Sequence, residues 1–137
     1  MGQYQQSYTY MNVMYNIENE PNSLAERIRD KAKIWADIFS ENTDSNNGQL
    51  KRFFNEFISL SQKIESDVRD LSASFNKILP LIYLMKAKAT YFYNRKFINE
   101  SFKEFICQNI DRIRTKEDFD EFIIYFEAII GYLKVQN

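Results

Sequence analysis

Apolar side chains recur at steps of three and four residues along most of the sequence, and this spacing constrains the fold more than any other feature. A first stripe runs through Leu24, Ile28, Ala32, Trp35 and Phe39, and comparable stripes follow in the rest of the chain. No segment alternates apolar and polar residues as a strand would, and 3 Gly and 2 Pro are too few for the many turns of a β-sandwich or barrel. The sequence therefore predicts an all-α fold, a compact single-domain bundle of five or six helices.

Polar signals mark where several of these helices should begin. Ser23 and Glu26 have the spacing of a capping box, so we expect the first helix over about residues 23–40. The polar segment "ENTDSNNG" predicts a loop, with Asn46 as the cap of the second helix.

Two further capping boxes are expected later in the chain. Ser101 stands three residues before Glu104, and Thr115 stands three residues before Asp118. Each pair precedes an apolar stripe, so we expect Ser101 and Thr115 to cap the last two helices.

Pro80 interrupts a third stretch of helical periodicity, between about residues 67 and 96. Because proline has no backbone N–H, either a short helix ends near Lys77 and Pro80 opens a new one, or a longer helix kinks there. We favour the first alternative.

The length of the chain corresponds to one domain with a single core. A domain of 137 residues buries roughly two thirds of the surface that its unfolded chain exposes. The first twenty residues are rich in Gln, Tyr and Asn, lack apolar periodicity and carry no charge before Glu18. We therefore expect an arm over residues 1–21, flexible or ordered by a partner, and a helical-bundle domain over residues 22–137.

Several classes of function are excluded by what the sequence lacks. No histidine occurs, which excludes Ser-His-Asp and Cys-His nucleophile activation and the usual His-rich metal sites. No Gly-rich phosphate-binding motif occurs either. The one cysteine, Cys107, cannot form an internal disulfide, and we interpret it as a small core residue. We expect no catalysis and no cofactor.

No segment has the features of a membrane span or a signal peptide. The longest apolar run, from Ile78 to Met85, has eight residues, whereas a spanning helix needs roughly 18. The beginning of the chain has no basic stretch followed by an apolar one. We expect a cytoplasmic protein that does not contact a membrane.

Basic residues gather in the middle of the chain. Residues 46–96 hold nine basic and four acidic residues, whereas the segments before and after them are net negative. In the tract "LIYLMKAKATYFYNRK" every charge is positive, and no acid occurs from Leu71 to Asn99. Such a tract with interleaved tyrosines suits RNA or another single-stranded backbone. A solvated helix face remains the alternative.

If the acid-free stretch that begins at Leu71 lies on one helix, three of its cations share a face. Lys77, Lys88 and Arg95 then return within about 20° of one another at 100° per residue. Lys88 and Arg95 would lie about 10 Å apart, within reach of phosphates a nucleotide or two apart on a strand. Lys86 would lie on another side of the helix.

Two motifs in the second half of the chain resemble a known family. The segment "KAKATYFYNRK" and the segment "FDEFIIYFEAIIGYLK" begin some thirty residues apart. The pair resembles the small helical subunit of type III-A CRISPR interference complexes, the Csm complexes. In that family a Lys-x-Lys-rich helix runs into a corner of a small residue plus Arg, and the last helix carries a Tyr-Phe-Glu-Ala-x-x-x-Tyr signature. The resemblance covers roughly residues 46–135 and includes "NNGQLKRFF" at the opening of the second helix.

The chain departs from the family pattern at a few positions. Asn46, Asn47 and Gly48 replace a hydroxyl-rich cap, and Lys51 stands where Arg is common, which keeps the charge but loses bidentate geometry. Asn94 occupies a place often held by Gly, and we expect it to tolerate a left-handed turn.

The resemblance implies a noncatalytic role in an RNA-guided complex. Copies of the subunit would stack along the filament, associate with one another and with the other Csm subunits, and lie beside the guide RNA and the target RNA. The candidates for contact with the backbone of the target RNA or the guide–target duplex are Lys51, Arg52, Lys77, Lys86, Lys88, Arg95 and Lys96. The alternative function is a helical scaffold for protein–protein interaction without nucleic-acid binding.

Acidic residues on the last helix allow more than one interpretation. Glu117, Asp118, Asp120 and Glu121 resemble a divalent metal site, but acids in the first turn of a helix also complement its dipole, and we favour that structural role. Glu127 stands between apolar residues, so we expect an Arg or Lys partner, either inside the bundle or across a subunit contact.

Overall fold

The computed structural model describes residues 20–41, 47–66 and 69–134, and these residues form six helices and no strand. The predicted all-α bundle is therefore confirmed. The helices are α2 (Leu24–Asp30), α3 (Ala32–Glu41), α4 (Asn47–Glu65), α5 (Leu71–Asn94), α6 (Glu100–Asp111) and α7 (Lys116–Tyr132). No helix in these ranges is long and apolar enough to cross a membrane.

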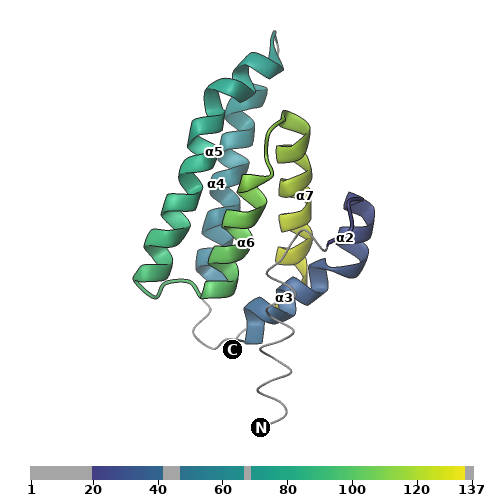
Figure 1. Cartoon of the computed structure of the whole chain (residues 1–137), viewed down its shortest axis with the longest axis vertical. Coiled ribbons are helices and arrows are strands. Elements are labelled where there is room, and N and C mark those ends of the chain that lie inside the picture. Colours follow the sequence, from purple (N-terminus) through teal and green to yellow (C-terminus); the bar gives the residue numbers. More distant parts are fainter. Residues whose placement is uncertain (1–19, 42–46, 67–68, 135–137) are drawn as a thin grey trace.

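The helix α5 lies along one side of the bundle, and α2 and α3 lie on the opposite side (Figure 1). α5 packs against α4 and α6, whereas α7 packs against α2, α3 and α4. The buried stripe of α5 is narrow and consists of Ser74, Phe75, Ile82, Met85 and Ala89. The outer surface of α5 is therefore open.

Aromatic rings fill the space between α3, α4, α6 and α7. The ring centroid of Phe105 lies 5.1 Å from that of Trp35 and 5.8 Å from that of Phe126. Phe57 meets Phe122 edge to face at 5.0 Å. Such offset and edge-to-face pairs stabilise a core beyond the area that they bury. These contacts join four helices from distant parts of the chain.

A buried carboxylate ties the start of the described chain to this core. Glu20 is 7% exposed, and its Oε1 accepts hydrogen bonds from Trp35 Nε1 at 2.6 Å and from the Tyr125 hydroxyl at 3.0 Å. Burial and the neighbouring Glu20 charge raise the pKa of the Tyr125 hydroxyl far above its ordinary value, so that it remains a donor. Residues 1–19 lie outside the described residues, and the division into an arm over 1–21 and a domain over 22–137 stays a prediction.

The prediction of one helix over residues 23–40 is wrong. Lys31 separates α2 from α3, with φ −116° and ψ −27°, although its N–H still donates to Arg27 O at 2.8 Å. The break lets α2 pack against α7, where Arg27 pairs with Glu121 and lies over the ring of Tyr125. Tertiary contacts of this kind override helical periodicity.

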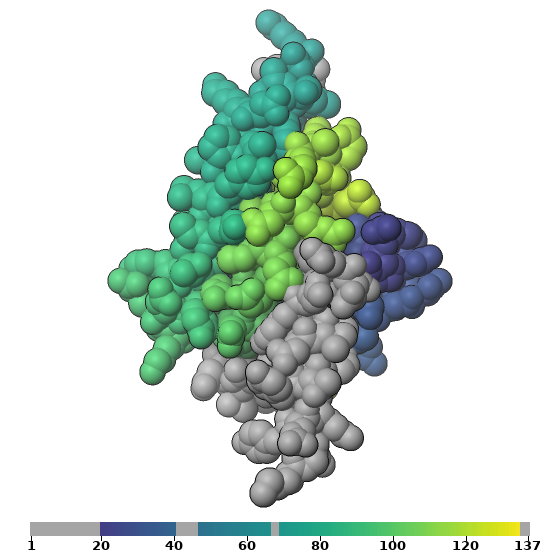
Figure 2. All heavy atoms as spheres, in the orientation of Figure 1, coloured from purple at the N-terminus to yellow at the C-terminus, as the bar shows by residue number. Residues whose placement is uncertain are grey.

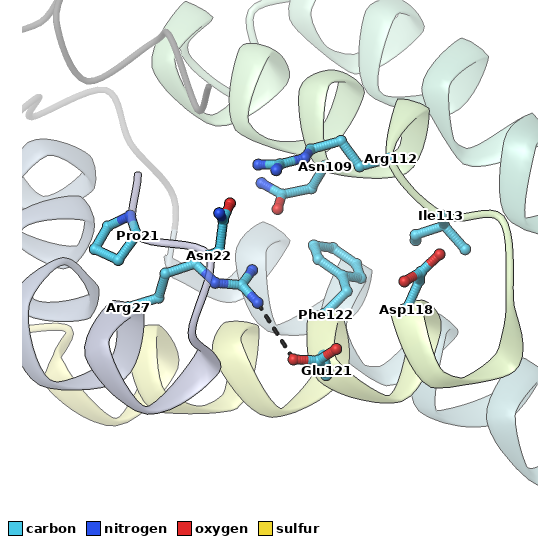
Figure 3. Close-up of a pocket in the computed structure, with 9 residues that line it drawn as sticks. All are labelled: Pro21, Asn22, Arg27, Asn109, Arg112, Ile113, Asp118, Glu121 and Phe122. Carbon is cyan, nitrogen blue, oxygen red and sulfur yellow. Dashed lines mark hydrogen bonds and ion pairs between the residues drawn. The ribbon is translucent and has the colours of Figure 1, made fainter. Parts of the chain in front are cut away.

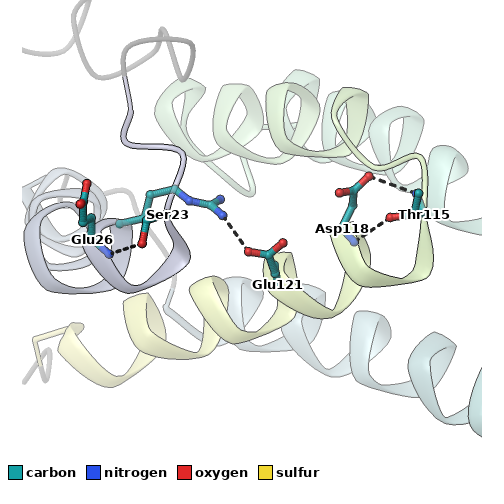
Figure 4. Close-up of polar contacts among 6 residues, drawn as sticks. Ser23, Glu26, Thr115, Asp118 and Glu121 are labelled. Carbon is teal, nitrogen blue, oxygen red and sulfur yellow. Dashed lines mark hydrogen bonds and ion pairs between the residues drawn. The ribbon is translucent and has the colours of Figure 1, made fainter.

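Two of the predicted caps are confirmed (Figure 4). Ser23 Oγ accepts a hydrogen bond from the backbone of Glu26 at 3.4 Å. Thr115 Oγ1 accepts from Asp118 N at 3.1 Å, and Asp118 Oδ2 accepts from Thr115 N at 3.1 Å, which completes a capping box at the start of α7.

The predicted cap at Ser101 is wrong. Asn99 is the cap of α6, and its Oδ1 accepts from Phe102 N at 3.0 Å. Ser101 lies in the first turn and donates its hydroxyl to the same Asn99 oxygen at 2.7 Å. The amide oxygen of Asn99 therefore serves both donors, and the helix begins earlier than the capping-box spacing indicates. The other predicted cap, Asn46, lies outside the described residues.

The favoured break at Pro80 is also wrong, because α5 continues through Pro80 from Leu71 to Asn94. Pro80 deprives the carbonyl of Asn76 of its helical partner. Both residues are exposed, so water can solvate that carbonyl. The longer-helix alternative is therefore the one that forms.

The C-terminus of α5 is a Schellman motif with Lys96 in the left-handed conformation. Lys96 has a φ of 63°, and its N–H donates to Tyr93 O at 2.9 Å, while the N–H of Phe97 donates to Phe92 O at 2.9 Å. The left-handed turn expected at Asn94 is therefore misplaced. Asn94 ends the helix, and the turn follows two residues later.

Replacing Glu20 by Ala should lower the free energy of unfolding by about 1–3 kcal/mol, because it leaves the Trp35 indole N–H and the Tyr125 hydroxyl buried without an acceptor. Urea unfolding followed by the fluorescence of Trp35, the single tryptophan, measures the change. Glu127→Ala, at an exposed position, is the control and should change the free energy by less than about 0.5 kcal/mol. Equal stabilities of the two variants would contradict the anchoring role of Glu20.

Replacing Pro80 by Ala should raise the free energy of unfolding, by at most about 3 kcal/mol, because Ala restores the hydrogen bond to Asn76 and is a far better helix former. The same urea titration measures this effect. A loss of stability would show that α5 needs the proline at this position.

Candidate nucleic-acid interface

An open groove runs between α4 and α5. The two helices are antiparallel, since Phe53 contacts Phe92 near one end and Ser74 Oγ donates to Ile64 O at 3.0 Å near the other. We call this hollow of about 290 Å³ the α4–α5 groove. It is lined by Glu56, Ser59, Leu60, Lys63, Leu81, Leu84, Met85 and Lys88.

Three of the predicted cations lie along the outer surface of α5. Because the segment is one helix that is capped by Arg95, Lys77, Lys88 and Arg95 return within about 20° of one another, and all three are exposed. In the space-filling view α5 forms the edge of the molecule on this side (Figure 2). Lys88 lines the α4–α5 groove, so the three cations follow the α5 wall of the groove.

Two of the predicted cations are paired with acids. Lys88 Nζ lies 2.9 Å from both carboxylate oxygens of Glu56 on α4. Lys86 points to the opposite flank of α5 and donates to Asp111 of α6, and this hydrogen bond raises the pKa of Lys86. Surface pairs such as these contribute about 0–1 kcal/mol each, so they restrain the side chains only weakly. Lys86 lies outside the α4–α5 groove.

The helix α4 brings a further pair of cations to the groove. Arg52 precedes Glu56 by one helical turn and Lys63 follows it by two, so the three share a face. The sequence prediction omits Lys63. Lys63 follows Arg52 by eleven residues, and this spacing indicates a shared helix face. Lys51 lies on the other flank of α4, on the side of Phe54, whose ring contacts α7.

Three basic residues lie near the C-terminal end of α5: Arg95, Lys96 and, on α4, Arg52. The guanidinium carbon of Arg95 lies 3.6 Å from the ring centroid of Tyr91, and Lys96 follows in an exposed turn. The contact between Phe53 and Phe92 brings the start of α4 to the same end. We define the basic groove as Arg52, Lys63, Lys77, Lys88, Arg95 and Lys96. Within the described ranges, Lys88 is the member that is ion-paired.

A second hollow, of about 220 Å³, lies between α2, α6 and α7 (Figure 3). Its charged lining consists of Arg27, Arg112, Asp118 and Glu121. Arg27 Nη2 lies 3.5 Å from Glu121 Oε1, and the carboxylate of Asp118 accepts hydrogen bonds from the backbone at the start of α7. Because its two basic and two acidic side chains balance, this hollow does not favour an anionic ligand as the basic groove does.

Three of the four acids near the start of α7 are engaged in structural contacts. Asp118 caps the helix, Asp120 accepts a hydrogen bond from Lys116 at 2.7 Å, and Glu121 pairs with Arg27. In the part of the chain that the structure describes, no group of acidic or thiol side chains has the arrangement of a metal site. The structural interpretation of these acids is supported by their partners.

Cys107 has the environment of an unreactive thiol. It is half-buried on α6, not fully in the core as predicted, and burial raises its pKa. A nucleophilic cysteine needs a lowered pKa instead.

Glu127 is exposed on α7, so the expectation of an Arg or Lys partner inside the bundle is wrong. The neighbouring Tyr125 and Phe126 are fully buried, whereas Tyr132, the last residue of the signature, is 49% exposed. The alternative, that Glu127 pairs with an Arg or Lys of a neighbouring subunit, stays a prediction.

The fold and the groove define a small all-α protein with an open basic surface. The family model Csm2 Type III-A matches residues 22–137, and the chain belongs to this family. The resemblance in the sequence is thereby confirmed, and the chain is a small subunit of a type III-A CRISPR complex. No curated protein and no solved structure matches the chain.

Proposed function

We propose that the chain is a noncatalytic, cytoplasmic subunit that contacts the backbone of the target RNA, or of the guide–target duplex, through the basic groove. In this proposal copies of the chain stack along the filament of the complex, beside the other Csm subunits. Membership of the family supports the place in the complex. The observation that carries the RNA contact is the concentration of six exposed cations on one surface, where Glu56 is the acid among the described residues that line the groove.

Contacts with phosphate suit this role because they carry no sequence information. A subunit that must accept any target leaves the reading of sequence to pairing between guide and target. Lys and Arg side chains along a groove bind successive phosphates and release counterions, which favours binding at low salt. The open side of α5 leaves room for a strand along the cations.

The predicted contact residues divide into two sets. Arg52, Lys77, Lys88, Arg95 and Lys96 belong to the basic groove, and Lys63 joins them. Lys51 and Lys86 lie on other flanks of their helices, and Lys86 is held by Asp111. For these two residues we propose contact only with a second strand or a neighbouring subunit.

The alternative, a scaffold that binds partner helices and no RNA, is favoured by the apolar residues on the open surfaces. Leu81 and Leu84 are 40% and 53% exposed on α5, and Ile124 and Tyr132 are 45% and 49% exposed on α7. Exposed apolar patches commonly mark contacts with other proteins. A scaffold would leave the basic groove without effect on RNA, so RNA binding separates the two functions.

Substituting Ala for Arg52, Lys63 and Lys77 should weaken binding to single-stranded RNA and make it less sensitive to salt. Each lost phosphate contact lowers the slope of log Kobs against log salt concentration by about 0.7, so the triple variant should lose about 2. Fluorescence anisotropy with a labelled RNA across a salt series measures both quantities.

The matched control substitutes Ala for Lys33, Arg114 and Lys134, three exposed cations outside the groove. It changes the net charge equally and should leave the slope unchanged. Equal slopes for the two triple variants would contradict the basic groove as the RNA contact. If the unaltered chain binds neither RNA nor other Csm subunits, the proposed function as a whole is wrong.

Glu56→Gln should strengthen RNA binding, because Glu56 competes with phosphate for Lys88 and repels the backbone. Removal of one charge contact near water is worth about 1 kcal/mol, which corresponds to about a fivefold tighter Kd. The anisotropy assay at low salt measures it. Unchanged or weaker binding would place the RNA outside the groove.

A further inference from the structure

The corner between α5 and α6 exposes aromatic rings beside cations. Tyr91 is 50% exposed and Phe97 is 47% exposed. Both rings lie against Phe92, at centroid distances of 6.1 and 5.7 Å. Phe92 in turn meets Phe53 of α4 edge to face at 5.2 Å, which joins the corner to the core. The exposed rings are therefore held on a rigid support.

Arg95 adds a planar cation to these rings. Its guanidinium carbon lies 3.6 Å from the centroid of Tyr91, a distance at which the cation lies directly over the ring. Arg95 is exposed and has no acidic partner among the described residues. The guanidinium therefore covers one face of the Tyr91 ring, and both side chains are exposed to solvent.

Lys96 stands in a conformation that favours glycine. A non-glycine residue at a φ of 63° is strained, and the corresponding position of a Schellman motif is usually Gly. The chain keeps a lysine there, next to Arg95 and at the end of a tract without acids from Leu71 to Asn99. Strained residues of this kind cluster where they serve binding.

We propose that this corner holds one unpaired ribonucleotide, with the base stacked on the surface formed by Tyr91, Arg95 and Phe97 and its phosphate beside Lys96. The inference rests on the proposed function and deepens it, because it adds contact with a base to contact with the backbone. Stacking on aromatic and guanidinium planes is how proteins bind splayed bases without reading their sequence. The corner adjoins the end of the basic groove, so a strand along the groove reaches it.

The test compares two RNA oligomers of equal length, one with all its bases and one with abasic positions, in binding to the full chain by anisotropy. The unaltered chain should bind the abasic oligomer about 5- to 100-fold more weakly, the range expected for one stacked base. Tyr91→Leu should remove most of this preference and leave the salt slope unchanged, because leucine keeps apolar bulk but has no π face. Tyr91→Phe should restore the preference.

Tyr132→Leu is the matched control, since Tyr132 has nearly the same exposure as Tyr91 but lies on α7. It should keep the preference for the complete oligomer. Lys96→Gly should raise the urea midpoint of unfolding by relieving the left-handed backbone, and should also weaken RNA binding. A gain in stability with unchanged RNA affinity would overturn the role of Lys96.

The failures of the two proposals are distinguishable. If both oligomers bind the unaltered chain equally and the triple variant of Arg52, Lys63 and Lys77 still loses its salt slope, the groove contact stands and base stacking at the corner is wrong. If the complete oligomer does not bind at all, both proposals are wrong.

Discussion

The aromatic packing between α3, α4, α6 and α7 is the constraint on which the rest of the molecule depends. Phe57, Phe105 and Phe126 lie at 0% exposure and connect these helices around one centre. The helix α5 adds Phe75, Ile82, Met85 and Ala89 to this core, and it attaches through this narrow apolar stripe. Phe53 and Phe92 fix its C-terminal end against α4, and Ser74 fixes its N-terminal end. The open face of α5, and with it the groove, follows from this arrangement.

The charge of each part of the surface depends on which basic side chains form ion pairs with acidic ones. Lys86 of α5 is ion-paired with Asp111 of α6, whereas Lys103 of α6 and Lys116 of α7 are each ion-paired with an acid of their own helix. The cations of the basic groove lie on a surface to which the tract from Leu71 to Asn99 contributes no acid, and among the described residues that line the groove Glu56 is the acid. The segregation of charge in the sequence therefore becomes a segregation in space, because α4 and α5 pair with each other along their length.

The helical class and most element positions could be predicted from apolar period and caps, since both depend on residues close in sequence. The errors have two kinds of cause. The break at Lys31 depends on distant contacts, because it serves the packing of α2 on α7. The error at Ser101 is local, because Asn99, two residues earlier, caps α6 and its amide oxygen serves two donors. Lys63 could have been found from its spacing to Arg52, but the acid partner of Lys88 could not, because it lies 32 residues away on another helix.

The two positions at which α5 breaks local rules lie on or beside its open side, and this location is informative. Pro80 inside a helix and Lys96 at a positive φ each have a conformational cost. At a buried position, steric conflict with neighbouring side chains would increase that cost. On a side that faces solvent, water can donate a hydrogen bond to the Asn76 carbonyl in place of the lost backbone N–H, and the ammonium group of Lys96 extends into solvent. A surface that served only to cover the core would gain from Ala and Gly at these positions. The retention of Lys96 beside Arg95 and two exposed rings therefore argues that this end of the helix is shaped for a ligand, with local stability lowered in exchange for a fixed positive charge.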